Sequence, residues 1–327
     1  MKTERTIRNC APALVLTLAL PGTRAAPGEP TREELAKDTK VFIELPSKEL
    51  KWEEPAEPLK IVGPLHFVGT RGLGAWLFAT SEGLILLNTG MPSSGAMIAA
   101  SIRKLGFKPE DLRILLNGHA HLDHAGALAE LKRLSGAQLA IMQEDVAAIE
   151  DGGKSDFHYG NDLKVMGFPS VKVDRVLRDG DTVRLGEVVL TALHTPGHTR
   201  GATTWMTELM DGGRAYVVVF PDGTSINPGY RVAKNPSYPG IEADFRRTLH
   251  RLEMLRPDIW LSHHPEGSAL EGKRKRAASE GVAAWVDPEG YRRFVAKLRR
   301  TFEDEVDAEL GVPKPSPAVK PASGTGK

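Results

Sequence analysis

Four side chains that can bind a metal ion lie within six consecutive positions, at His119, His121, Asp123 and His124. Histidine is the commonest metal ligand near neutral pH, and carboxylate oxygen also suits zinc. In an extended segment alternate residues project to the same side, so His119 and His121 can hold one ion. Asp123 and His124 come where a helical pattern begins, so they can reach a neighbouring position. The run predicts a site for two metal ions rather than a surface cluster of histidines.

Two further segments place histidines after strand-like apolar runs. One is a Pro-Gly turn that carries His194 and His198, and the other is a buried run that ends in His263 and His264. Seven of the ten histidines of the chain therefore lie in three segments. Since strand ends carry the chemistry of many α/β proteins, we expect the three segments to meet at one site.

The three remaining histidines lie outside these segments. His66 falls within a strand pattern and His250 on an amphipathic helix, so both are expected to be structural. His158 belongs to a segment rich in Gly, Asp and Asn at 151–162, which we interpret as a mobile flap beside the site. His158 is therefore a candidate for contact with a substrate.

Composition sets the broad class of protein. The chain has 327 residues, 41% of them hydrophobic and 26% charged, which is ordinary for a soluble globular protein with a full core. Its formal net charge is +1. That balance argues against a dedicated nucleic-acid or membrane surface, so we expect neither partner. No long apolar stripe remains once the core is assigned, so the expected state is a monomer.

The N-terminus has the pattern of a targeting segment. Basic residues precede the apolar run 11–20, and small residues follow near Ala25. This is typical of a secretory signal peptide at 1–25, and the run is shorter than the ~20 residues of a membrane-spanning helix. The mature protein is then expected in the periplasm and off the membrane. It would lack Cys10, the only cysteine, which excludes thiolate ligands and disulfides.

The elements that must position these histidines alternate in type along the chain. Strand patterns occur at 65–69, 75–79, 83–88, 112–116, 138–142, 202–208, 215–220 and 257–261, and hairpins at 173–193. Helical patterns occur at 93–105, 125–134, 241–255 and 291–310. Each half of the chain starts with strands and then alternates with helices. This order predicts two stacked sheets between two helical layers, with ligands from both halves.

These patterns divide the chain into four parts. We expect the signal peptide at 1–25, an N-terminal arm at 26–58, one domain at 59–311 and a disordered tail at 312–327. A single domain is the simplest account, because neither half alone carries a complete metal site.

Several motifs together carry a resemblance to a known family. They are the run at 119–124, His-x-x-Gly-His-Thr from His194 with Thr203-x-Trp205 after it, the segment from Asp222 to Tyr230, and His264-Pro265. With these motifs the chain resembles the metallo-β-lactamase superfamily, and most closely its subclass B3, from about residue 52 to residue 310. The resemblance implies the α/β class and an αββα sandwich of two stacked mixed sheets flanked by helices.

The resemblance also assigns roles to residues. It implies a first zinc ion (Zn²⁺) on His119, His121 and His198, and a second on Asp123, His124 and His264. Within this pattern His263 is the weaker ligand candidate, because the family's ligand directly precedes the proline, and it is expected to support a ligand or to pack. Ser225 and Tyr230 are substrate contacts or loop-stabilising residues.

The implied activity is hydrolysis of the β-lactam amide bond of penicillins, cephalosporins and carbapenems. Two zinc ions lower the pKa of a shared water toward ~7, so that hydroxide attacks the lactam carbonyl. Asp123 orients that hydroxide as well as binding zinc.

The chain departs from the family pattern at three positions. Asn88 stands where the superfamily usually has Asp, which removes a charge behind the metal loop but keeps the shape. Gly223 replaces a serine that helps to hold metal-bound water in many B3 enzymes, so the second zinc is expected to bind more loosely. Arg200 replaces a proline and adds a positive charge near the mouth of the site.

Two rival functions remain open. One is a lactonase or a glyoxalase-II-like thioesterase, which bridges its metals with an Asp near the position of Asp222. The other is a non-catalytic periplasmic zinc-binding protein, which predicts no open coordination position. Three protein ligands on each ion leave room for water, which argues against the second rival.

Overall fold

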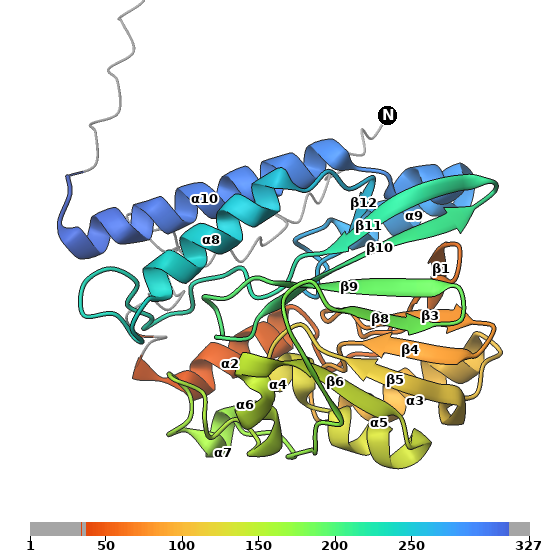
Figure 1. Ribbon diagram of the computed structural model, residues 1–327, viewed down its shortest axis with the longest axis horizontal. Helices are drawn as coiled ribbons and strands as arrows, with labels where there is room; N and C mark the ends of the chain where they lie inside the picture. The colour runs from red at the N-terminus through yellow and green to blue at the C-terminus, as the bar shows by residue number, and fades with distance from the viewer. Residues whose placement is uncertain (1–33, 35–36, 314–327) are drawn as a thin grey trace, which may run out of the picture.

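The computed structural model describes residue 34 and residues 37–313 (Figure 1). The expected signal peptide at 1–25, Cys10 and most of the tail expected at 312–327 lie outside the described residues. The described part of the N-terminal arm contains one helix, α2 (Thr39–Glu49). Asp38 caps this helix by accepting a hydrogen bond from the amide of Val41.

The first sheet has seven strands in sequential order. The strands are β1 (Leu59–Val62), β2 (Leu65–Phe67), β3 (Trp76–Thr80), β4 (Gly83–Leu87), β5 (Leu112–Leu116), β6 (Gln138–Met142) and β7 (Arg175–Leu177). The pairs from β1 to β4 are antiparallel and the pairs from β4 to β7 are parallel, so the sheet is mixed. Parallel neighbours need crossover connections. These connections contain α3 (Ser94–Lys104), α4 (Leu122–Ala125), α5 (Leu128–Ser135), α6 (Val146–Glu150) and α7 (Leu163–Met166).

The second sheet has five strands in the order β12-β11-β10-β9-β8. They are β8 (Thr182–Leu185), β9 (Val188–His194), β10 (Thr203–Asp211), β11 (Arg214–Phe220) and β12 (Ile259–Trp260). Only the pair β11 and β12 is parallel, and the long helix α8 (Ile241–Met254) connects these two strands. Helices α9 (Leu270–Glu280) and α10 (Pro288–Leu310) follow β12.

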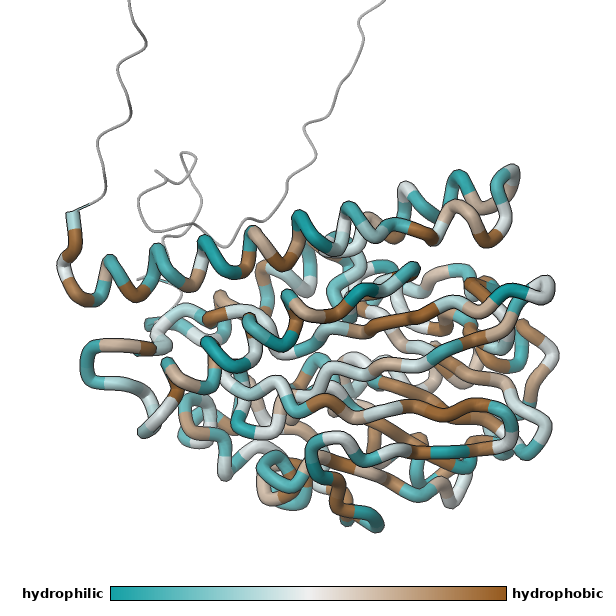
Figure 2. Tube along the Cα trace, turned by 45° about the horizontal axis from the view of Figure 1, so that its top comes forward, coloured by the Kyte–Doolittle hydropathy of each residue, from teal (hydrophilic) through white to brown (hydrophobic). Residues whose placement is uncertain are grey.

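The two sheets pack face to face with helices outside them. A buried cluster between the sheets joins Trp76 and Phe78 of β3 to Trp205 of β10 and Phe220 of β11. Helices α3 and α5 cover the other face of the first sheet, and α8 and α10 cover the second (Figure 1). Hydrophobic residues concentrate along the strands in the middle of the molecule (Figure 2). The αββα arrangement expected from the sequence is thus confirmed.

Most predicted elements are confirmed, and one prediction is half wrong. The helices expected at 93–105, 241–255 and 291–310 are α3, α8 and α10. In the region 173–193 only β8 and β9 form a hairpin, because β7 pairs with β6 in the other sheet. Strand β1 and helix α9 were not expected. Within the described residues no helix is both long enough and apolar enough to cross a membrane.

Candidate metal centre

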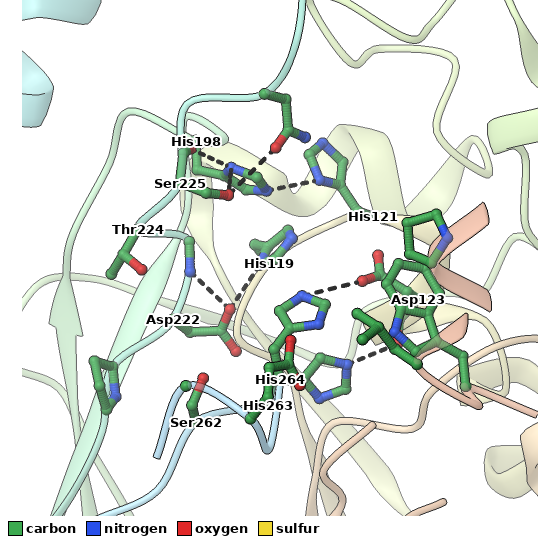
Figure 3. Close-up of a pocket in the computed structure, with 18 of the residues that line it drawn as sticks. His119, His121, Asp123, His198, Asp222, Thr224, Ser225, Ser262, His263 and His264 are labelled. Atoms are coloured by element: carbon green, nitrogen blue, oxygen red, sulfur yellow. Dashed lines mark hydrogen bonds and ion pairs between the residues drawn. The ribbon is translucent and has the colours of Figure 1, made fainter. Parts of the chain in front are cut away.

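Three chain segments converge at one edge of the sandwich, as their strand-end positions predicted. His119 and His121 follow β5, His198 follows β9 and His264 follows β12. Figure 3 shows these side chains around one pocket. His264 has a side chain that is 39% exposed, whereas the other three are buried. The structure therefore brings residues from both halves of the chain into one cluster.

The first group of ligands consists of His119, His121 and His198, whose ligand nitrogens all lie within 4.8 Å of one another. Each ring has one nitrogen that donates to an oxygen. His119 Nδ1 lies 2.8 Å from Asp222 Oδ1, and His198 Nδ1 lies 2.6 Å from the carbonyl oxygen of Ser225. His121 Nε2 lies 3.3 Å from Asp156 Oδ2. In neutral rings the second nitrogen then carries a lone pair.

Two of these lone pairs face each other. His121 Nδ1 lies 3.0 Å from His198 Nε2. A neutral ring carries one proton, so if His121 Nε2 and His198 Nδ1 donate, the two nitrogens that face each other have no proton. Two facing lone pairs repel each other unless a proton or a metal ion satisfies one of them. Burial lowers the pKa of His121, but Asp156 outweighs it and raises the pKa, so this position favours a positive charge. Three neutral imidazoles also suit zinc, which binds histidine nitrogen at about 2.0–2.1 Å. The donor set of this group therefore fits a metal ion.

The second group surrounds Asp123. Its Oδ2 lies 3.6 Å from His124 Nε2 and 3.4 Å from His264 Nε2. Burial raises the pKa of Asp123, but the neighbouring histidines, His124 first, outweigh it and hold the pKa well below its ordinary value. The carboxylate is thus ionised and available as a ligand. His124 is buried, and its Nε2 has no hydrogen-bond partner among the described residues, which fits a metal ligand.

Asp222 lies behind the histidines. Its Oδ1 accepts hydrogen bonds from His119 Nδ1 and from the Gly223 amide, and its Oδ2 accepts one from Asn88 Nδ2 at 2.9 Å. Oδ2 also lies 3.3 Å from His124 Nδ1. Asp222 therefore faces the Nδ1 nitrogens of two rings and leaves their Nε2 nitrogens toward the metal positions. This arrangement is typical of a carboxylate that orients metal-binding histidines.

Asp145 is a functional residue that the sequence analysis missed. Its carboxylate accepts hydrogen bonds from the amides of Ala120 and Gly201 and from the hydroxyl of Thr199, at 2.8–2.9 Å. Burial raises the pKa of Asp145. The residue joins the loop of His119 and His121 to the loop of His198. Its sequence setting, an acidic run after a strand, gives no sign of this role.

The pocket over the metal cluster has a volume of about 240 Å³ and largely apolar walls. Residues of the arm and of α10 supply these walls, namely Phe42, Ile43, Pro46, Leu50, Trp52, Phe294 and Leu298. The Trp52 ring lies 5.5 Å from that of His264. The sequence predicted only an N-terminal arm at 26–58, whereas helix α2 of this arm lines the pocket.

The three candidate substrate contacts have different surroundings. Ser225 lines the pocket, with its hydroxyl 3.3 Å from Asn227 Oδ1. The Tyr230 hydroxyl is buried and donates to the carbonyl oxygen of His198 at 2.9 Å, which favours its loop-stabilising role. His158 is half-buried and its ring packs on Tyr159 and Tyr230, away from the pocket lining. Geometry thus favours only Ser225 as a direct substrate contact.

His263 borders the pocket, but its ring nitrogens face backbone oxygens. Nδ1 lies 2.6 Å from the Gly74 carbonyl oxygen, and Nε2 lies 2.9 Å from the Asp123 carbonyl oxygen. The side chain is buried. This setting favours a supporting or packing role over metal binding, and the contact with the Asp123 carbonyl oxygen places His263 beside a proposed ligand.

The structure shows the contacts of the three residues that depart from the family pattern. Asn88 donates to Asp222 and accepts from the Gly118 amide at 2.7 Å, so it uses both ends of its amide. Gly223 has φ +60°, and a Cβ there would meet Ala202 Cβ at 2.4 Å, so serine would require a local shift. The Arg200 guanidinium lies 5.0 Å from the Tyr238 ring centroid and is not part of the pocket lining.

Known proteins are similar to this chain in structure and in sequence. The sequence pattern of the metallo-beta-lactamase superfamily matches residues 74–205. The structure of the native FEZ-1 metallo-beta-lactamase from Legionella gormanii aligns with a TM-score of 0.77 and 41% identity, over 79% of this chain and 98% of that one. BJP-1, a subclass B3 metallo-beta-lactamase of Bradyrhizobium japonicum, aligns with a TM-score of 0.75 and 34% identity, over 81% and 98%.

Curated relatives include other hydrolases. A hydroxyacylglutathione hydrolase of Rhodopseudomonas palustris is 31% identical over 68% of this chain and 80% of its own length. A probable metallo-hydrolase of Burkholderia pseudomallei is 30% identical over 55% of this chain, and the match covers only 60% of that relative's length. An N-acyl homoserine lactonase of Bacillus sp is 25% identical over 46% of this chain, and the match covers 64% of that relative's length.

Proposed function

Because the chain belongs to the metallo-beta-lactamase superfamily, we propose that it hydrolyses the amide bond of β-lactam antibiotics with two bound zinc ions. The fold and the histidine-rich groups are those of a hydrolase of this superfamily. The similarity to solved metallo-beta-lactamases covers nearly their whole length, which supports the lactam substrate.

The proposed ligands divide into two sets. His119, His121 and His198 would hold the first zinc ion, and Asp123, His124 and His264 the second. Zinc, when bound, polarises a carbonyl group and lowers the pKa of water toward ~7. With three protein ligands on each ion, coordination positions remain for water and substrate.

Other side chains act on the substrate and on the attacking water. The Asp123 carboxylate lies beside His124 and His264 and groups with His119 of the first set within 4.8 Å, so it can accept a hydrogen bond from the attacking water and orient its oxygen. The Ser225 hydroxyl lines the pocket and can donate to the carboxylate that β-lactams carry. The apolar side chains of α2 and α10 would exclude bulk water and contact apolar substituents.

The position of Asp222 is the observation that carries the choice of substrate. In the lactonase and thioesterase alternative this carboxylate bridges the metals. Here both of its oxygens are engaged by His119, Gly223 and Asn88, on the side of His119 away from its Nε2. An orienting Asp222 supports the lactamase over the bridged alternative. The non-catalytic alternative has less support, because a lined pocket opens onto the cluster.

The biological setting is part of the same proposal. A signal peptide at 1–25 would export the chain to the periplasm, where β-lactams reach their targets. We expect penicillins, cephalosporins and carbapenems as substrates, a contribution to antibiotic resistance, and a monomeric enzyme.

The test is hydrolysis of a carbapenem and a chromogenic cephalosporin by the purified mature protein, with and without a chelator and after addition of zinc. A homoserine lactone and a glutathione thioester serve as competing substrates. Chelator-sensitive β-lactam turnover that zinc restores would support the proposal. A protein that binds two zinc ions but turns over only the lactone or the thioester would contradict it.

A further inference from the structure

The loop 151–162 contains a buried carboxylate that contacts the metal cluster. Asp156 has a side chain that is only 4% exposed. Its Oδ1 accepts hydrogen bonds from the amides of His158 at 2.8 Å and Tyr159 at 2.6 Å. Its Oδ2 accepts one from His121 Nε2 at 3.3 Å. One carboxylate therefore organises the loop and holds a metal-facing histidine.

The same loop leads on to the wall of the pocket. The Tyr159 ring lies 5.4 Å from the His121 ring and stacks on Phe42 of α2 at 6.2 Å, with 11° between the planes. Phe42 lines the pocket. A continuous set of contacts therefore runs from His121 through Asp156 and Tyr159 to the helix that covers the site.

From these contacts we infer that Asp156 is a positioning residue that couples zinc binding at His121 to ordering of the loop 151–162. The inference rests on the zinc-binding part of the proposed function and not on the β-lactam substrate. By accepting from Nε2, Asp156 keeps the lone pair of His121 on Nδ1, the nitrogen that lies 3.0 Å from His198 Nε2. Coupling of this kind is reciprocal, so zinc must order the loop as much as the ordered loop favours zinc.

The substitution Asp156→Asn separates the two tasks of the carboxylate. If the amide keeps its oxygen toward the amides of His158 and Tyr159, its NH₂ group faces His121 Nε2. That contact requires a lone pair on Nε2 and moves the proton to Nδ1, which then cannot bind zinc. If the amide is turned round, two backbone donors face the NH₂ group and the loop loses its anchor. Either arrangement weakens the coupling.

The experiment measures zinc affinity and amide hydrogen exchange in the whole mature protein, as wild type, Asp156→Asn and Asp151→Asn. Zinc alone is the probe, in competition with a chromophoric chelator. We expect zinc to slow exchange of the 151–162 amides in the wild type. Asp156→Asn should weaken the tighter zinc site by about 10- to 100-fold and lose most of that protection.

Asp151→Asn is the matched control, because Asp151 lies in the same loop but is exposed, and its carboxylate accepts hydrogen bonds from the amide and the hydroxyl of Ser155 rather than from a metal-facing histidine. It should retain the wild-type zinc affinity. Equal exchange of the loop in zinc-free and zinc-loaded wild type would overturn the inference without any variant. The inference would also be overturned if Asp156→Asn bound zinc within about threefold of the wild-type affinity. Removal of a residue that orients a metal ligand usually costs about 10- to 100-fold in affinity. Wild-type protein that binds no zinc would overturn the proposed function as well, whereas absence of β-lactam turnover alone would leave the coupling intact.

Discussion

His121 Nδ1 lies 3.0 Å from His198 Nε2, and the other nitrogen of each ring donates to an oxygen of the protein. Two ring nitrogens this close are unfavourable unless a proton or a metal ion satisfies one of them. A zinc ion that takes the place of the proton can bind both nitrogens, so zinc is expected to stabilise the folded state.

Removal of zinc should therefore lower the stability of the folded protein. We expect the melting temperature to fall in a chelator and to recover with zinc, and a zinc concentration of 100 times Kd to add about 2.7 kcal/mol to the free energy of unfolding. Differential scanning calorimetry of zinc-free and zinc-loaded protein measures this. Magnesium is the control and should restore nothing, because it prefers oxygen ligands. Identical melting temperatures in both forms would contradict the prediction.

The two adjacent histidines after β12 should respond differently to substitution. His264→Ala should reduce the zinc content from two ions to one with little change in the stability of the zinc-free protein, because its side chain is 39% exposed. His263→Ala should lower the free energy of unfolding by about 2 kcal/mol or more, since it leaves a cavity and removes the one N–H that the neutral ring donates to a backbone carbonyl oxygen. Zinc analysis and urea unfolding distinguish the two outcomes. Loss of one zinc ion from His263→Ala with unchanged stability would reverse the assignment.

The six proposed ligands were predictable because their signal is local. Alternate residues such as His119 and His121 share a side in any extended segment, and strand ends meet at one edge of a sheet. The structure brings the six together, while their roles as ligands remain predictions. The stacked sheets were predictable for a similar reason, since the order of strand and helix patterns limits the possible layers.

The supporting residues were not predictable, because their contacts join positions distant in sequence. Asp145 and Asp156 reach Ala120 and His121 across 25 and 35 residues. An isolated Asp in an acidic or Gly-rich run has the same local pattern whether it is exposed or buried. The pairing of β7 was predicted wrongly for the same reason, since three residues alone do not specify which sheet they join.

The apolar wall from α2 should affect bulky substrates more than small ones. Phe42→Ala removes an aromatic ring from the pocket, and such contacts contribute about 0.5–1.5 kcal/mol. We expect kcat/KM to fall about two- to tenfold for β-lactams with an aromatic side chain and to change less for those with a small one. Val41→Ala is the control, because Val41 is exposed and does not line the pocket. Equal losses for both classes of substrate would count against a specific contact.

A buried lysine should make stability depend on alkaline pH. Burial lowers the pKa of Lys273 in spite of Asp287, whose Oδ2 lies 3.2 Å from Nζ. Between this lowered pKa and the ~10.4 of the unfolded chain, the unfolded state binds more protons, so the free energy of unfolding rises with pH. The rise is about 1.4 kcal/mol for each unit of lowering. Urea unfolding between pH 7 and pH 11 should show it in the wild type and not in Lys273→Met, and parallel pH profiles would refute it.

Replacing Asn88 by aspartate, the residue that the superfamily usually has at this position, should lower the stability of this protein. Its Nδ2 donates to Asp222 Oδ2 at 2.9 Å, while its Oδ1 accepts from the Gly118 amide. Asn88→Asp keeps the acceptor but places two carboxylates side by side in a buried site, so one of them must take up a proton. We expect a loss of about 1–3 kcal/mol in the free energy of unfolding at pH 7.

The pH dependence of Asn88→Asp separates this cause from a change of shape. The pKa of the introduced carboxyl group is raised in the folded state, so its penalty is present above the ordinary carboxyl pKa and shrinks as the pH falls toward ~4. Asn235→Asp is the matched control, because Asn235 also has a positive φ, +52°, but is exposed. Its stability should follow the wild type at every pH. A deficit in Asn88→Asp that stayed constant from pH 8 to pH 5 would show that repulsion from Asp222 is not its cause.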